Sequence, residues 1–122
     1  MKHLLLTTIA VTSVLATTGF AGPIHNAAFS GNIEAVKQHI AAGTDMDVKD
    51  DKYGWTTLHW AAIGGYKEMV ELLIAEGADV NTKGYRGTTP LDDAIQQKRT
   101  ETADLLRKHG GKTGLELRAA AK

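Results

Sequence analysis

Two histidines, His25 and His59, are the first candidates for chemistry in this chain, because a histidine titrates near neutral pH and can move a proton. A catalytic histidine also needs a nucleophile or a carboxylate arranged around it. No such constellation is visible near either residue, and the absence of cysteine removes thiol nucleophiles, cysteine-ligated zinc and iron–sulfur clusters. The sequence therefore predicts a protein that is not an enzyme.

The acidic run from Asp45 to Asp51 is a candidate for calcium, which prefers clustered oxygen ligands. An EF-hand loop beginning at Asp45 would place Lys49 at its fifth position, Asp50 where glycine is needed and Thr56 in place of the bidentate glutamate. The run fails the pattern at three positions, so we expect a solvated loop and no metal site.

Gly111-Lys112-Thr113 has the composition of the end of a phosphate-binding loop. The earlier glycine of that motif would fall at position 106, which is leucine, and no apolar strand precedes it. We interpret the segment as a helix terminator and expect no cofactor. Lys and Arg (14) balance Asp and Glu (14), and the sequence pI is about 7.0, so no basic field is available to hold nucleic acid.

The first residues have the order of a secretory signal. Met1-Lys2-His3 carries a positive charge, Leu4 to Leu15 is free of charge and proline, and small residues follow up to Ala21. We expect residues 1–21 to be a signal peptide cut after Ala21, with Ala16 as the alternative cut and a membrane anchor, for which the apolar run is short, as the alternative role. The mature chain is then periplasmic or secreted, is not membrane-bound, and carries no lipid at its N-terminus, since no cysteine exists.

The rest of the chain repeats itself. A shift of 34 residues superimposes Ala27-Ala28 on Ala61-Ala62 and Gly31 on Gly65, and a further shift of 33 superimposes Thr56 on Thr89 and Leu58 on Leu91. A period of this length indicates stacked supersecondary units that share nearest-neighbour contacts.

The middle unit, with Gly54-Trp-Thr-Thr-Leu-His-Trp-Ala-Ala followed by Gly65-Tyr-Lys-Glu-Met-Val-Glu-Leu-Leu-Ile-Ala-Glu-Gly-Ala-Asp-Val-Asn, resembles the ankyrin repeat. The resemblance extends from about Pro23 to Gly111. It implies an all-α fold, an ankyrin-repeat solenoid of about three helix-turn-helix repeats with projecting β-hairpin loops. It also implies that His25 and His59 form hydrogen bonds between loops.

Local signals agree with paired helices. Thr56 and Thr89 are candidate N-caps, the second followed by proline at the first helical position, and Asn32 is a candidate N-cap of a second helix. Gly31 and Gly65 can end the first helices with a positive φ.

We divide the chain into the signal peptide, repeat 1 at 22–53 as an N-terminal cap, repeat 2 at 54–86, repeat 3 at 87–111 as a C-terminal cap, and a tail at 112–122. Repeat 3 differs from the others, with Asp92 in place of histidine, Ile95 in place of the second alanine and Lys98 in place of the turn glycine. Thr113 and Glu116 form a possible capping box for a short tail helix, whose Leu115 and Leu117 would cover the end of the array.

The resemblance implies a concave surface, made of hairpin tips and the exposed face of the first helices, that binds a partner protein. Transferred to this sequence, its exposed positions include Asp93, and the predicted partner-binding residues are Phe29, Tyr53, Trp55, Trp60, Ile63, Tyr85 and Arg86. Aromatic residues and arginine bury much area at low entropic cost, which favours them at interfaces.

Two alternatives remain open at this point. Phe29 and Trp60 could pack between neighbouring first helices, while Tyr53 and Trp55 cover a hairpin stem. The chain, which we expect to be a monomer, could instead self-associate as a scaffold through Ile24, Phe29 or Leu115, or act as an effector on a host protein.

Overall fold

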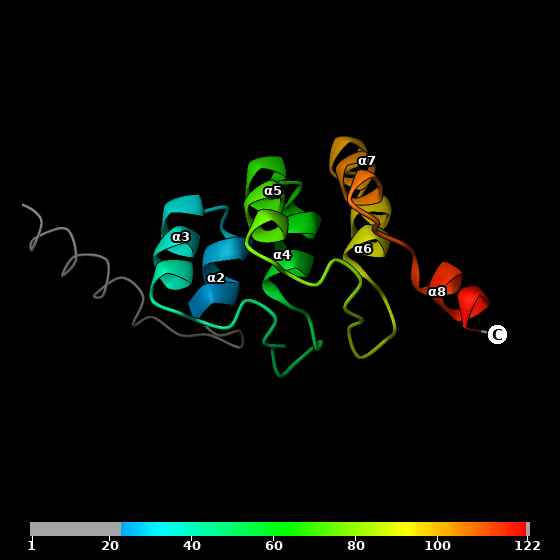
Figure 1. The fold of residues 1–122 in the computed structure, drawn as a ribbon, viewed down its shortest axis with the longest axis horizontal. Coiled ribbons are helices and arrows are strands. Elements are labelled where there is room, and N and C mark those ends of the chain that lie inside the picture. Colours follow the sequence, from blue (N-terminus) through cyan, green and yellow to red (C-terminus); the bar gives the residue numbers. More distant parts are fainter. Residues whose placement is uncertain (1–22, 122) are drawn as a thin grey trace, which may run out of the picture.

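The computed structural model describes residues 23–121, which form a row of paired helices followed by one further helix (Figure 1). The predicted signal peptide lies outside the described residues. No strand occurs in the described part, so the all-α prediction is confirmed. The helices are α2 (Pro23–Phe29), α3 (Ile33–Ala41), α4 (Thr57–Gly64), α5 (Lys67–Ala75), α6 (Pro90–Gln96), α7 (Thr100–Lys108) and α8 (Gly114–Ala120).

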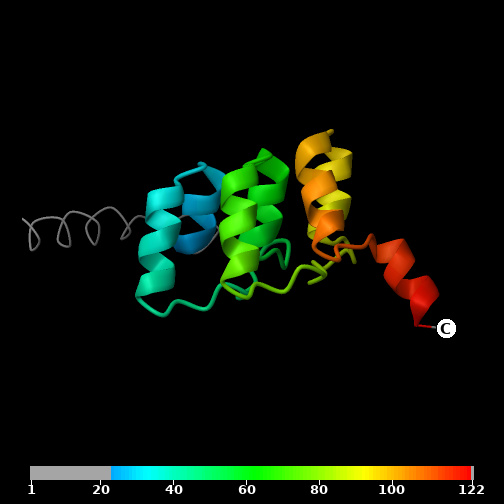
Figure 2. The same ribbon diagram turned by 45° about the horizontal axis from the view of Figure 1, so that its top comes forward.

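Three helix pairs stack side by side, each pair being one helix-turn-helix unit (Figures 1 and 2). The first helices pack in a row, with α4 between α2 and α6. The second helices lie behind them, and α5 packs against α7. Each unit thus contacts its own neighbours in the row, as expected of a solenoid.

The helices begin where the sequence places caps. The side chain of Asn32 accepts a hydrogen bond from the backbone of Ala35 at 3.1 Å. Thr89 and Asp92 bond reciprocally to each other's backbone N–H at 3.2 and 3.0 Å, with proline at the first helical position. Thr56 forms the same kind of capping box with His59. These three predicted N-caps are confirmed.

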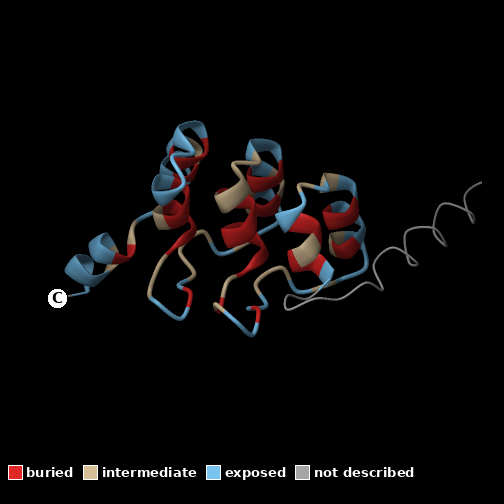
Figure 3. Ribbon diagram, turned by 180° about the vertical axis from the view of Figure 1, so that it is seen from behind, coloured by how far each residue is buried: buried red, intermediate tan, exposed pale blue. Residues whose placement is uncertain are grey.

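The core lies between the helices of the row, where the ribbon is red in Figure 3. Paired alanines let neighbouring first helices approach closely, because they have no bulk beyond the β-carbon. Apolar side chains at helical spacing on the second helices fill the remaining space. Buried members of the core include Ala28, Ala61, Ala62, Ala94, Val36, Val70, Leu58, Leu73, Leu91 and Leu106.

Two loops, residues 42–56 and 76–89, project from the same side of the row (Figure 1). Each folds back on itself through a backbone hydrogen bond, from Asp50 N–H to the Trp55 carbonyl at 2.8 Å and from Gly84 N–H to the Thr88 carbonyl at 2.9 Å. The N–H of Tyr85 also donates to the carbonyl of Tyr53 at 2.8 Å, which joins the second loop to the first. Each loop therefore ends in a turn, and a hydrogen bond links the two loops.

The tail helix α8 forms as the capping box predicts, with the Thr113 side chain accepting from Glu116 N–H at 3.1 Å. It extends away from the row (Figure 2), and Leu115 is 69% exposed. The expectation that Leu115 covers the end of the array is therefore wrong, while Leu117, expected to do the same, is half-buried. The helix is directed outward because Gly114 N–H is held by the Asp92 carboxylate at 2.7 Å, at the loop side of α6.

Candidate protein-binding surface

Four aromatic rings from α2, α4 and the first loop meet, and we call Phe29, Tyr53, Trp55 and Trp60 the aromatic cluster. Trp60 is its centre, with ring centroids 5.2 Å from Phe29 and 5.0 Å from Trp55, both edge to face. Tyr53 and Trp55 stack at 4.4 Å. Rings in these geometries attract one another beyond the area they bury, so the cluster is a rigid unit.

The predicted partner-binding residues differ in exposure. Phe29 is 57% exposed and Tyr85 66% exposed, Arg86 is also exposed, and Tyr53, Trp55 and Ile63 are half-buried. Trp60 is only 4% exposed, so the expectation of an exposed position is wrong for this residue and the core alternative holds. Its ring supports the others from beneath. Ile24, one candidate for self-association, is buried as well.

A buried carboxylate, Asp50, fixes the aromatic cluster to the first loop. One oxygen accepts from the backbone N–H of Tyr53 at 2.7 Å and of Gly54 at 3.0 Å, and the other accepts from Trp60 Nε1 at 2.9 Å. The loop conformation and the indole orientation are thereby set by a single side chain. The sequence does not predict this role of Asp50, which enters the calcium test only as a mismatch at the glycine position, because its third donor is ten residues away along the chain.

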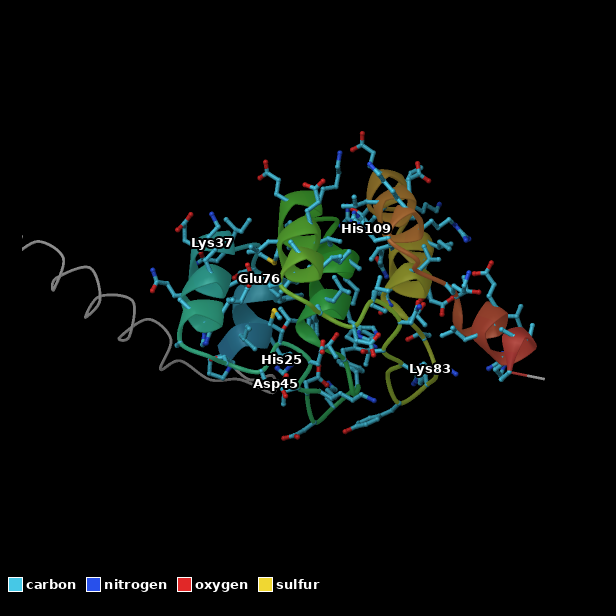
Figure 4. All side chains as sticks on the ribbon, in the orientation of Figure 1. His25, Lys37, Asp45, Glu76, Lys83 and His109 are labelled. Carbon is cyan, nitrogen blue, oxygen red and sulfur yellow. The ribbon has the colours of Figure 1, made fainter. Side chains whose placement is uncertain are left out.

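Tyr85 extends the cluster onto the second loop. Its hydroxyl donates to the carbonyl of Asp50 at 3.4 Å, a contact made across 35 residues of sequence. The tips of both loops carry basic side chains, among them Lys52, which lies 5.3 Å from the centre of the Tyr53 ring, and Lys83, labelled on the second loop in Figure 4. The same loops also carry acidic side chains, so the loop side combines exposed aromatic rings with charges of both signs.

Each of the two histidines links the first helix of its repeat to the loop that follows the repeat's second helix. His25 Nε2 donates to the carbonyl of Val48 at 2.8 Å, and His59 Nε2 donates to the carbonyl of Thr88 at 3.1 Å. His59 Nδ1 accepts from Thr56 N–H at 3.0 Å. Burial lowers the pKa of His59 to about 4, so the ring is neutral at pH 7 and serves as a structural link.

Repeat 3 makes the equivalent link, but its side chain accepts a hydrogen bond where the histidines donate one. Asp92, which stands in place of the histidine, accepts from Gly114 N–H where the histidines donate to a carbonyl. A carboxylate suits this position because the following segment presents a donor. The replacement of histidine by Asp92 in repeat 3 is thus explained by its hydrogen-bond partner, the N–H of Gly114.

Asp93, a buried acid on α6, takes no part in the links made by His25, His59 and Asp92. Asp93 is 3% exposed, and its Oδ2 has no hydrogen-bond partner within the described residues. Burial and the neighbouring Asp92 raise the pKa of Asp93 to about 7, while a hydrogen bond with the Thr88 side chain opposes that shift. The expectation that Asp93 is exposed is therefore wrong.

The described part of the chain contains no cluster of three or more His, Asp or Glu side chains that could hold a metal ion. Within residues 23–121, no helix has the length and apolar character needed to cross a bilayer. The described residues offer an aromatic surface for contact.

The family model for ankyrin repeats (3 copies) matches residues 24–116. Serine/threonine-protein kinase 12 of Arabidopsis thaliana is 40% identical over 84 residues, covering 67% of this chain and 18% of the kinase. Protein phosphatase 1 regulatory subunit 12A of Mus musculus is 43% identical over 70 residues, covering 57% of this chain and 7% of the subunit. The 26S proteasome non-ATPase regulatory subunit 10 of Homo sapiens is 38% identical over 65 residues, covering 53% of this chain and 29% of that protein.

The chain therefore spans less than a third of the length of each of these relatives, and what they share with it is the repeat array. The matched segment runs through all three helix pairs and ends inside α8. On the family match, the repeat spacing and the stacked helix pairs, this chain belongs to the ankyrin-repeat family.

Proposed function

We propose that this chain is a non-catalytic binding module that holds a partner protein on its loops and on the adjoining concave face of its first helices. The surface consists of the aromatic cluster together with Ile63, Tyr85 and Arg86. Two of the relatives are named as regulatory subunits, one of a phosphatase and one of the proteasome, which agrees with a role in binding. Export to the periplasm or the exterior is part of the proposal and rests on the order of residues 1–21.

The observation that carries the proposal is the exposure of aromatic rings on a rigid support. Phe29 and Tyr85 leave more than half of their surface open to solvent, although each contacts an ordered neighbour. The support is preorganised by Asp50, so a partner that covers these rings has little ordering entropy to overcome. Large rigid aromatic side chains on such a support are typical of interface hot spots.

The test is differential capture by the full chain carrying Phe29→Ala and Tyr85→Ala together. Both side chains are exposed, so we expect the melting temperature to change by only a few degrees. Binding of the protein retained from an extract of the source cells should weaken by about tenfold or more.

The matched control is Leu115→Ala, which removes an equally exposed apolar side chain from α8, outside the proposed surface. It should retain the same bound protein at wild-type affinity. Equal retention by the control and by the double variant would refute the assignment of the surface.

A further inference from the structure

Asp93 stands in repeat 3 at the position that Trp60 occupies in repeat 2, because a shift of 33 residues relates the two repeats. In repeat 2 this position fixes the first loop, since Trp60 Nε1 donates to the Asp50 carboxylate at 2.9 Å. The position of Asp50 is held in repeat 3 by Lys83, which is exposed on the second loop (Figure 4). The second loop is therefore not fixed by the contact that fixes the first.

The carboxyl group of Asp93 is buried with one oxygen unsatisfied. The residue is 3% exposed, and Oδ2 has no hydrogen-bond partner within the described residues. Within the same residues, no lysine, arginine or histidine lies within ion-pair distance of the carboxyl group. A buried carboxylate is costly unless it is paired and hydrogen-bonded, whereas a neutral acid is tolerated far better. The site therefore suits the protonated form of Asp93.

The charged and titratable groups around α6 do not relieve this burial. On the same helix, the adjacent Asp92 adds to burial in raising the pKa of Asp93 to about 7. On α4, which packs against α6, the titratable side chain is His59, and burial lowers its pKa to about 4. The other charged side chains that flank α6 are exposed to solvent: Lys83, Arg86, Lys98, Arg99, Asp104 and Arg107.

Thr88 connects Asp93 to the second loop. The side chain of Thr88 forms a hydrogen bond with Asp93. The carbonyl of Thr88 accepts from His59 Nε2 at 3.1 Å and from Gly84 N–H at 2.9 Å. The bond to Gly84 closes the turn that carries Tyr85. A change in the charge of Asp93 therefore acts directly on the residue that closes the second loop.

We propose that Asp93 is a pH-sensitive switch of the second loop: the neutral acid keeps the loop closed against α6, and the carboxylate releases it, which weakens partner binding. The inference rests on the proposed function, because Tyr85 and Arg86 of this loop belong to the proposed surface. An ionised Asp93 needs water that the closed loop excludes. The loop is the element that yields, since it projects from the row (Figure 1) and Thr88 is half-buried, whereas Leu91 and Ala94 of α6 are fully buried.

The direction of the switch follows from proton binding. With the loop closed the pKa of Asp93 is about 7, and with the loop open the side chain meets water and returns toward the ordinary aspartate pKa of 3.8. Between these values the closed state binds more protons, so a rise in pH favours the open state until the effect levels off above 7. The first loop has no such response, because the indole of Trp60 does not titrate.

The experiment is amide hydrogen exchange of the full chain, wild type against Asp93→Asn, at about pH 5.5 and about pH 7.5. Its reporters are the N–H groups of Gly84 and Tyr85, which are hydrogen-bonded in the closed loop. Protection of these amides in wild type, relative to Asp93→Asn, should fall by about tenfold between the two pH values. His59 titrates in both proteins, so its contribution cancels in the ratio. Exchange faster than that of α5 amides marks the release as local.

Asp104→Asn is the matched control variant, because it neutralises an exposed acid of the same repeat by the same change of atoms. Its protection of the second loop should follow wild type at both pH values. The N–H of Asp50, bonded to the Trp55 carbonyl, is the internal reference in the first loop. Its protection ratio between wild type and Asp93→Asn should not vary with pH.

The binding probe is the protein captured by the wild-type chain in the test above, once purified. Relative to Asp93→Asn, wild type should bind it about threefold or more weakly at the higher pH. A second-loop protection ratio that does not vary with pH would overturn the switch, and a ratio that varies while affinity does not would overturn its role in binding. Failure of the proposed function is a separate result, since the exchange measurement uses the chain alone.

Discussion

Single residues decide how the loop side of this protein is built, and Asp50 is the clearest case. Its carboxylate accepts three hydrogen bonds, two from the backbone of its own loop and one from the indole of Trp60. A buried acceptor with this many partners cannot be removed without leaving donors unpaired. Asp50 therefore determines the position of the aromatic cluster as well as the fold of the loop.

Replacing Asp50 by alanine should lower the free energy of unfolding by about 1–3 kcal/mol, because the Trp60 Nε1–H and two backbone N–H groups lose their acceptor. Denaturant unfolding followed by tryptophan emission measures the change. Asp51→Ala, at the exposed neighbouring position, is the control and should stay within about 0.5 kcal/mol of wild type. Equal effects of the two variants would show that the carboxylate network does not stabilise the loop.

Asp93 gives a second prediction at this scale, through pH. Its pKa is about 7 in the folded chain and near the ordinary aspartate value of 3.8 when unfolded, so between these values the folded state binds more protons. The contribution of Asp93 to stability is thus full at low pH and is lost as pH rises toward 7. His59, with a folded pKa of about 4, contributes the opposite slope between pH 4 and the ordinary histidine pKa of 6.5.

Asp93→Asn removes the first effect alone, since asparagine stays neutral. Its melting temperature relative to wild type should rise as pH increases from 4 to 7 and level off above that range. Thermal melts of both proteins across that range provide the test. A difference between them that does not vary with pH would contradict the raised pKa.

At the scale of elements, the sequence predicts well what is local. The caps at Asn32 and Thr89, the box at Thr113 and the glycine at each inner turn depend on neighbours within a few residues, and the structure confirms them. The side chains of Tyr66 and Arg99 were not assigned a role, because their acceptors are more than thirty residues away. The sequence leaves the burial of Trp60 open for the same reason, since that burial depends on rings from α2 and from the first loop.

The tail helix α8 is held to the row by a few polar contacts, including Gly114 N–H to Asp92 and Arg107 to Glu116. Thr113→Ala should therefore unfold α8 locally without affecting the row, because the capping hydroxyl serves only this helix. Hydrogen exchange should show faster exchange of amides in 114–120 and unchanged protection in α4 and α5. Loss of protection in α5 would mean that α8 stabilises the whole stack.

At the scale of the whole molecule, the three units form one stack that carries the aromatic cluster. The period of the sequence is enough to predict the stack, since each unit repeats the same local signals. The shape of the aromatic surface could not be predicted from the period. It depends on the contact between the two loops and on the Asp50 network, which join residues from different repeats.

The chain contains two tryptophans, and both belong to the aromatic cluster, so they report on the proposed binding surface alone. The most direct test of the central claim is fluorine NMR of the full chain labelled with 5-fluorotryptophan, titrated with its captured, unlabelled partner. Binding should shift or broaden the Trp55 resonance, which is half-exposed, more than that of the buried Trp60. Stoichiometric binding that leaves both resonances unchanged would contradict the claim that the partner binds on this surface.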